Sequence, residues 1–273
     1  MLPIAVLLII GLYPLIFSFW MSLHWWPLVQ YKEPYYLGAE NYVHLLTASY
    51  FPQVLMTTFL YVCGSVGIAF FVGLGLALLS QSESRIIGLL RAYLLLPILL
   101  APIAVALIFK FLYNSLYGPV VLIYRGISGI TINFLSKNYA LPSLIIADAW
   151  QWTPFMFLVL LSALLYIPKE QNEAAAVDGV NSWQKLRYIT LPWLKNIIII
   201  LILLRGTVCF GEVDKIWVIT MGGPGRGTET LAFTTYVQGF YHSHMLGESA
   251  AIGFIILIIV NILYLVFTKV FKD

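Results

Sequence analysis

Six long apolar stretches constrain the fold of this chain more than any other feature of its sequence. A transmembrane helix needs about 20 consecutive, mostly apolar residues. The stretches that qualify are Leu2–Leu23, Leu55–Leu79, Ala92–Leu112, Leu141–Ile167, Asn196–Val218 and Ala250–Phe271. Only 10% of the residues are charged, against about 25% in soluble domains, so a water-soluble fold is excluded. The runs are too continuous for the alternating strands of a β-barrel. The sequence predicts an all-α polytopic membrane protein with six transmembrane helices.

Two of the stretches need a closer reading. The first, Leu2–Leu23, could be a signal peptide, but no basic residues precede it and no small-residue cleavage site follows it, so a retained helix is predicted. The fifth is interrupted by four charged residues, Arg205, Glu212, Asp214 and Lys215. Prolines inside the stretches predict kinks, which a helix bundle tolerates because neighbours satisfy the freed carbonyls; they are Pro14, Pro97, Pro102 and Pro154.

The distribution of Lys and Arg over the loops predicts the orientation, since cytoplasmic loops are enriched in these residues. Segments 80–91, 168–195 and 269–273 would lie on one side and hold 8 basic residues in 45 positions. The opposite segments, 24–54, 113–140 and 219–249, hold 4 in 90. The fourfold difference in density predicts that both termini are cytoplasmic.

The loop at residues 168–195 is the most polar part of the chain and predicts a helix–turn–helix outside the membrane. Pro168 followed by acidic residues is typical of a helix start, and Gly179 is placed to end the helix with a positive φ. Ser182 can cap a second short helix, and Pro192 precedes the return into the bilayer. Taken alone, this composition also suits an ordinary amphipathic connector.

The residue string in this loop is more specific than its composition. It reads Glu-Ala-Ala-x-x-Asp-Gly, followed about ten residues later by Ile-x-Leu-Pro, and comprises Glu173, Ala174, Ala175, Asp178, Gly179, Ile189, Leu191 and Pro192. It resembles the EAA loop of ABC importer permeases. The resemblance covers nearly the whole chain and is strongest to the sugar-importer branch with a maltose-type permease fold. The departures are modest: Leu186 stands where Phe is usual, and Asn196 where many members have Pro.

The resemblance implies a single transmembrane permease domain over residues 1–273, with 168–195 as the cytoplasmic coupling loop that docks on a separate ATPase. It also implies one half of the translocation pathway of an ATP-driven sugar or polyol importer in the inner membrane of a prokaryote. The implied partners are a second permease subunit, two copies of the ATPase, an external solute-binding protein, the carbohydrate and membrane lipid. ATP and Mg²⁺ would be bound by the ATPase, since this chain has no P-loop and is expected to carry no cofactor and no enzymatic activity. A net charge of +3 gives no reason to expect a nucleic acid partner.

Faces that combine polar and aromatic or apolar side chains are predicted on two helices, at positions i, i+3, i+4 and i+7. On the fourth helix they are Asp148, Gln151, Trp152 and Phe155, and on the fifth they are Arg205, Val208, Cys209 and Glu212. The resemblance implies that substrate passes along these faces. Aromatic rings can stack on a sugar while carboxylate and amide groups take its hydroxyls.

Asp148 and Arg205 can instead form an ion pair between the two helices. At 1.5 Å per residue, Arg205 lies about 15 Å from the cytoplasmic end. Asp148 lies about 10 Å below the outer end of a core about 30 Å thick. The gap in depth is about 5 Å, which an arginine side chain spans. The sequence leaves three possibilities open for Asp148 and Arg205: they pair with each other, they contact the substrate, or they do neither.

Three other functions are weighed against the sugar importer. An importer of an anionic sugar or glycerol phosphate would use Arg205 as its anchor. A secondary transporter would need repeat symmetry and coupling carboxylates, and the EAA string would be unexplained. An intramembrane enzyme would need paired catalytic groups or a metal cluster. None is evident, and no metal site is predicted from the scattered histidines, which are His24, His44, His242 and His244.

Overall fold

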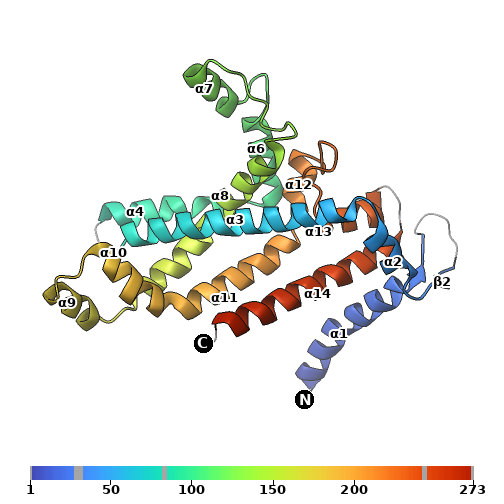
Figure 1. The fold of residues 1–273 in the computed structure, drawn as a ribbon, viewed down its shortest axis with the longest axis horizontal. Coiled ribbons are helices and arrows are strands. Elements are labelled where there is room, and N and C mark those ends of the chain that lie inside the picture. Colours follow the sequence, from blue (N-terminus) through green and yellow to red (C-terminus); the bar gives the residue numbers. More distant parts are fainter. Residues whose placement is uncertain (1, 28–32, 82–84, 242–244, 272–273) are drawn as a thin grey trace.

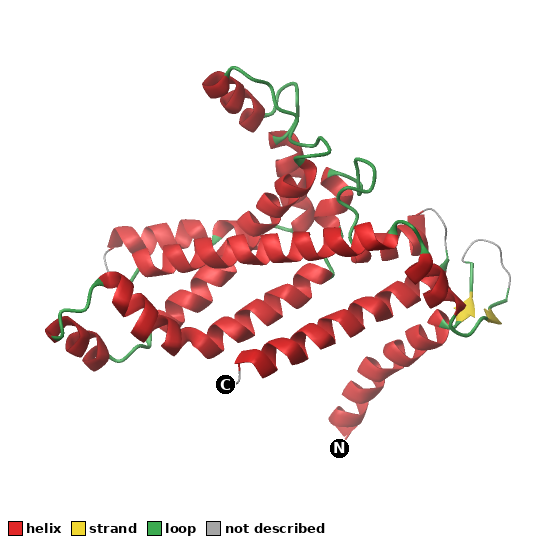
Figure 2. Ribbon diagram, in the orientation of Figure 1, coloured by secondary structure: helices red, strands yellow, loops and turns green. Residues whose placement is uncertain are grey.

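The structure, a computed structural model, describes residues 2–27, 33–81, 85–241 and 245–271. In chain order the elements are α1 (Leu2–Ser22), β1 (His24–Trp25), β2 (Tyr35–Tyr36), α2 (Glu40–Thr47), α3 (Phe51–Leu79), α4 (Arg85–Leu94), α5 (Leu96–Leu99), α6 (Pro102–Leu112), α7 (Pro119–Ser128), α8 (Ala140–Leu165), α9 (Lys169–Val177), α10 (Ser182–Lys185), η1 (Leu186–Thr190), α11 (Leu191–Phe210), α12 (Asp214–Ile219), α13 (Leu231–Tyr236), η2 (Val237–Tyr241) and α14 (Leu246–Phe271). The two η elements are π-helical turns. Figure 2 shows a helical molecule in which β1 and β2 form a small antiparallel hairpin at one end.

The centre of the bundle is the pair α3 and α8, which pack against each other (Figure 1). They come very close at Gly73. A Cβ atom on this residue would lie 2.8 Å from the Cβ of Met156 and 3.0 Å from the backbone N of Phe157. Because real Cβ atoms essentially never come that close to other heavy atoms, only glycine allows the two helices to meet here. α11 and α14 complete the core beside this pair.

Four helices among the described residues are long and apolar enough to span a membrane: α3, α8, the continuous helix Ser182–Phe210, and α14. The predicted first span corresponds to α1, whose side chains are described only from Ile10 onward. That part, Ile10–Ser22, is shorter than a span. The predicted helical membrane fold is confirmed, but a count of six spans is not reached in the described part of the chain.

The predicted third span, Ala92–Leu112, is not one straight helix. Helix 87–99 and α6 meet at an angle of 97°. The reason lies in Pro102, which has no N–H to donate and which forces the residue before it into an extended conformation; Ala101 has φ −60° and ψ 141°. The bend frees the carbonyl of Leu100, and the Gln151 side chain on α8 donates a hydrogen bond to it at 3.0 Å. The kink expected from proline is therefore a break.

The predicted fifth span, Asn196–Val218, is wrong at both ends. The helix begins earlier, within the continuous segment Ser182–Phe210, and it ends at Phe210. After three non-helical residues, α12 begins at Asp214. Glu212, Asp214 and Lys215 lie at or directly after that interruption, whereas Arg205 lies within α11. Arg205 and Lys215 pair with Asp148 on α8, Glu212 pairs with Lys215, and Asp214 is exposed.

Candidate functional site

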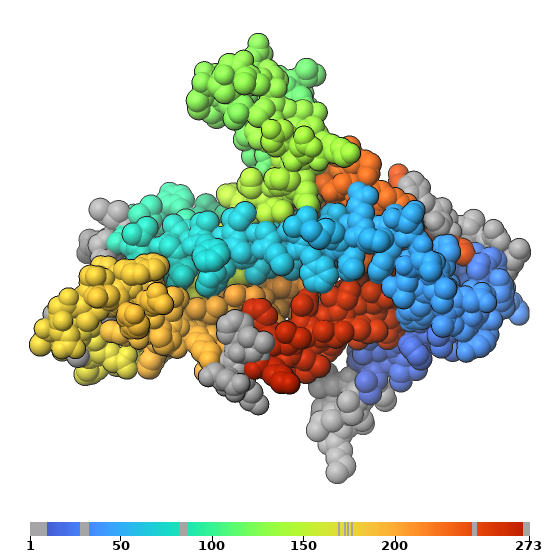
Figure 3. Space-filling view, in the orientation of Figure 1, coloured from blue at the N-terminus to red at the C-terminus, as the bar shows by residue number. Residues whose placement is uncertain are grey.

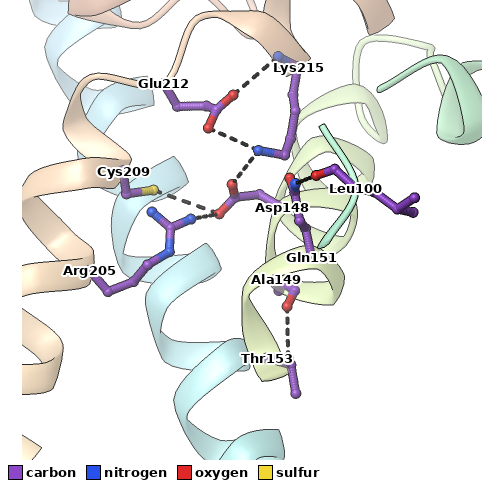
Figure 4. A network of polar contacts seen from close by, with 9 residues as sticks. All are labelled: Leu100, Asp148, Ala149, Gln151, Thr153, Arg205, Cys209, Glu212 and Lys215. Carbon is purple, nitrogen blue, oxygen red and sulfur yellow. Dashed lines mark hydrogen bonds and ion pairs between the residues drawn. The ribbon is translucent and has the colours of Figure 1, made fainter. Parts of the chain in front are cut away.

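A buried carboxylate on α8 joins three helices at the centre of the bundle. Asp148 accepts a charge-assisted hydrogen bond from the guanidinium of Arg205 on α11, and it forms an ion pair with Lys215 Nζ on α12 at 3.1 Å. All three side chains are fully buried. The ion pair between Asp148 and Arg205, one of the possibilities left open by the sequence, is present, and Figure 4 shows the two side chains pointing toward each other.

A second carboxylate balances the charge. Glu212 lies in the interruption between α11 and α12, and its Oε2 accepts a hydrogen bond from Lys215 Nζ at 2.9 Å. The four groups, Asp148, Glu212, Arg205 and Lys215, are called the charge network below. Two carboxylates face two cations, which is the arrangement that makes buried charges tolerable. Lys215 was noted in the sequence as a charge that interrupts the fifth stretch but was not included among the predicted site residues. Its i,i+3 spacing from Glu212 was a signal that could have placed it there.

The predicted polar face of α8 is mostly turned inward. Arg205 lies over the indole ring of Trp152, with Cζ 4.5 Å from the ring centroid, a cation–π arrangement. Phe155 packs edge-on against Trp152 and belongs to the apolar core. Gln151 is buried and its amide holds the Leu100 carbonyl at the break between α5 and α6. The contacts of these side chains hold the bundle together.

The predicted polar face of α11 is only half present. Cys209 is buried and its Sγ lies 3.9 Å from Asp148 Oδ2. Val208 lies on the same helix, is 44% exposed and takes no part in the network. Glu212 is not on the helix at all, because α11 ends at Phe210. The grouping of all four residues on one helical face is therefore wrong for Glu212, which reaches the network through the non-helical turn.

Several buried polar atoms beside the charge network have no hydrogen-bond partner among the described residues. They are Nε and Nη1 of Arg205, Nε1 of Trp152 and the hydroxyl of Tyr61. Buried donors of this kind normally bind ordered water or a ligand. The arrangement can therefore supply hydrogen bonds to water or to hydroxyl groups, while the paired charges stay neutralised.

The coupling segment predicted at 168–195 is a helix–turn–helix at the end of α8 and the start of α11, visible at the left of Figure 1. Gly179 has φ +68°, as predicted. The N–H of Val180 donates to the carbonyl of Ala175 at 3.0 Å, the bond that closes a Schellman cap. The predicted N-cap at Ser182 is one residue off. Asn181 caps α10 instead, through a capping box with Gln184.

The two halves of the EAA string come together around one groove of about 540 Å³. It is lined by Gln171, Ala175, Asp178, Val180, Tyr188, Ile189, Pro192 and Trp193. Ala175 is buried, whereas Glu173 and Asp178 are exposed, and Leu191 begins α11 just before Pro192. Ala174 lies in α9, but its side chain is outside the part of the chain that the structure describes. His242 and His244 are outside the described residues as well.

Comparison with known proteins places this architecture in a family. The model of the binding-protein-dependent transport system inner membrane component matches residues 1–273. The trehalose/maltose transport system permease protein MalF of Thermococcus litoralis is 33% identical, over 98% of this chain and 90% of that protein. The lactose transport system permease protein LacF of Rhizobium radiobacter is 30% identical, over 95% of this chain and 88% of that protein.

Solved structures agree on the fold. A bacterial ABC transporter involved in the import of the acidic polysaccharide alginate superposes with a TM-score of 0.81. The match covers 99% of this chain and 93% of that chain at 20% sequence identity. The helical architecture, the helix–turn–helix between α8 and α11, and the match along the full length agree with one another. This chain belongs to the family of binding-protein-dependent transport system inner membrane components, and it is a permease subunit of an ABC importer.

Proposed function

We propose that this chain forms half of the translocation pathway of an ATP-driven importer for a neutral sugar or polyol. The family makes it a transport subunit and not an enzyme. The names of its relatives, which include a trehalose/maltose and a lactose permease protein, support a carbohydrate substrate. The working complex would contain a second, different permease subunit, two copies of a cytoplasmic ATPase that bind ATP and Mg²⁺, and an external solute-binding protein.

The balance of the charge network supports a neutral substrate. An anionic sugar or glycerol phosphate would need a cation free to bind it, and Arg205 was the candidate anchor. Arg205 is held by Asp148, and Lys215 is held by both Asp148 and Glu212. Exchanging a carboxylate partner for a substrate anion would leave the carboxylate buried and unpaired, which is costly. Hydroxyl groups need only the unpaired donors of Arg205, Trp152 and Tyr61.

The observation that carries the proposed coupling role is the position of α9. Glu173 and Gly179 are exposed on a helix and turn that stand outside the bundle, directly between α8 and α11 (Figure 1). A force applied to this segment reaches both helices that hold the Asp148–Arg205 pair. We infer that an ATPase docks on α9 and moves α8 and α11 together, so that the pathway opens alternately to the two sides.

The coupling role is tested by changing the docking surface without changing the fold. Gly179→Asn adds a side chain at a position with φ +68° and open space around it, and asparagine tolerates this backbone conformation. Gly129→Asn is the matched control, because Gly129 also ends a helix, with φ +71° and open space, but lies far from α9. Glu173→Ala removes an exposed charge from α9, and Glu40→Ala, which removes an exposed charge from α2, is its control.

The measurements are sugar uptake in cells and copurification of the ATPase. Gly179→Asn and Glu173→Ala should lower both, while Gly129→Asn and Glu40→Ala should leave both near the wild-type level. Undiminished uptake in the Gly179 and Glu173 variants would refute the coupling role. Uptake of neutral disaccharides, with sugar phosphates as competitors, tests the substrate class in the same strains.

The orientation follows from the coupling role, since an ATPase can reach α9 only from the cytoplasm. We propose that both termini are cytoplasmic, that Lys185 faces the cytoplasm and that Arg226 faces outward. Single cysteines at these positions, in a chain lacking Cys63 and Cys209, report the side directly. An impermeant thiol reagent should label position 226 in intact cells and position 185 only after lysis. Labelling of 185 in intact cells would invert the topology.

A further inference from the structure

The helix α7 carries an apolar surface that nothing in the described chain covers. Leu122, Ile123 and Ile127 are 49%, 63% and 84% exposed. At 100° per residue they lie within one arc of the helix, and the buried residue Val121 lies on the other side. Figure 1 and Figure 3 show α7 standing clear of the main bundle. An exposed arc of this kind marks an interaction surface.

The position of α7 fixes the depth at which this surface lies. The segment containing α7 is attached to the first turn of α8, because Tyr113 donates to the carbonyl of Ser143 at 3.2 Å and Ser143 Oγ donates to the carbonyl of Phe134 at 2.8 Å. The other end of α8 leads into α9. The residues on both sides of α7 are therefore held at the end of α8 opposite α9, the level at which a spanning α8 would leave the bilayer.

Aromatic rings gather at the same level. Tyr113 and Phe134 stack on each other at the edge of the core, and Tyr124 of α7 meets Phe134 edge-on. Tyr117 lies 5.6 Å, centroid to centroid, from Phe111 at the end of α6. Tyr117 and Tyr124 are exposed. Tyrosines concentrate where a bilayer meets water, because one end of the ring is apolar and the other is polar, and these two exposed rings fit such an interface.

The apolar arc of α7 continues a lipid-facing stripe. Ile103, Leu107 and Phe111 follow one another at intervals of four residues along α6 and are all exposed. The Phe111–Tyr117 contact joins that stripe to the segment leading into α7. The charge of the region fits a lipid surface as well. No Asp or Glu occurs between residues 84 and 147, whereas Lys110, Arg125 and Lys137 do.

From these observations we propose that α7 lies in the headgroup region of the outer leaflet and binds anionic phospholipid. Leu122, Ile123 and Ile127 enter the acyl chains, and Arg125, which no described acidic side chain pairs with, binds a headgroup phosphate. Amphipathic helices with a basic flank bind membranes in this way. α7 then anchors the outer end of α8, whose Asp148 holds the charge network, to the lipid.

The proposal is tested with spin labels on single cysteines in the complete transporter, reconstituted in nanodiscs of phosphatidylcholine with phosphatidylglycerol. Labels at positions 123 and 127 probe the apolar arc. A label at Ser128, on the opposite side of the helix and also exposed, is the matched control. Positions 123 and 127 should be reached more readily by oxygen, which concentrates in lipid, than by a water-soluble neutral nickel chelate. Position 128 should show the reverse.

Two results would overturn the lipid assignment. Nickel access at 123 and 127 equal to that at 128 would put the helix in water, and shielding from both probes would mean that a protein partner covers the arc. The role of Arg125 is tested by Arg125→Gln, which should reduce the lipid-inserted population of a label at 127 about fivefold, the effect of one cation near an anionic surface. An inserted population that is unchanged by Arg125→Gln would refute the binding of a headgroup phosphate.

Discussion

Replacing Asp148 with asparagine removes one charge from a network that is balanced. Arg205 then has no carboxylate partner, while Lys215 keeps Glu212. Arg205 is fully buried, so its charge cannot be hydrated without opening the bundle. Breaking a buried ion pair from one side costs about 3–5 kcal/mol, and we expect Asp148→Asn to fall at the upper end of that range.

Arg205→Gln should cost less, about 3 kcal/mol, at the lower end of the same range. The reason is that Asp148 keeps Lys215 at 3.1 Å when Arg205 is gone. The double variant removes both charges of the pair and leaves Lys215 with Glu212, so it should be more stable than the sum of the two single losses predicts, by about 0.5–3 kcal/mol of coupling. Thr153→Val on α8, which loses only a neutral intrahelical hydrogen bond to Ala149, should cost about 1 kcal/mol.

The assay is the free energy of unfolding in mixed detergent and SDS micelles, together with the yield of assembled complex in cells. All four forms of the Asp148 and Arg205 cycle are measured side by side with Thr153→Val. The order expected is that Asp148→Asn is worse than Arg205→Gln, and that the double variant recovers part of the loss. Strictly additive losses, or an Arg205→Gln variant with the stability and assembled yield of the wild type, would refute a stabilising pair between Asp148 and Arg205.

Two further predictions concern the packing around the network. Gly73→Ala should destabilise the subunit by about 1–3 kcal/mol, because the added Cβ meets the backbone of α8. Gly75→Ala, whose Cβ enters open space, should be neutral. Equal thermal stability of the two variants would contradict the close contact. Gln151→Leu should lower the free energy of unfolding by about 1–3 kcal/mol, because it leaves the carbonyl of Leu100 unpaired. Gln53→Leu at the surface, measured in the same way, should change it by less than about 0.5 kcal/mol.

The helical membrane fold was predictable because its signal is summed over many residues. Each apolar run of about 20 residues can be buried in lipid only as a helix, so α3, α8 and α14 were found with small errors at their ends. The coupling segment was predictable for a different reason. Gly179 ends α9 through a local backbone requirement that one residue type satisfies.

The break at Ala101 and the early end of α11 were harder to predict, because both depend on contacts between helices. Pro102 signals a disturbance, but the sequence shows neither the 97° angle nor that Gln151 of α8 donates to the freed carbonyl. The i,i+3 spacing of Glu212 and Lys215 would fit a continuous helix as well as it fits the observed interruption after Phe210. Only the position of Asp148 on α8 explains why the chain leaves the helix there and turns Lys215 inward.

The π-helical turn at Leu186–Thr190 sets a rotational phase between α10 and α11. The N–H of Leu191 bonds to the carbonyl of Leu186, five residues back, and Pro192 has no N–H with which to restore the normal pattern. An α-helix turns by about 100° per residue, so a turn containing one extra residue offsets α9 and α10 by about that angle relative to Arg205. Exchange between the π and α patterns would therefore swing the coupling segment about the axis of α11 in a discrete step. The orientation of α9 and α10 about the axis of α11 would then take one of a few discrete angles, whereas a flexible linker would allow a continuous range.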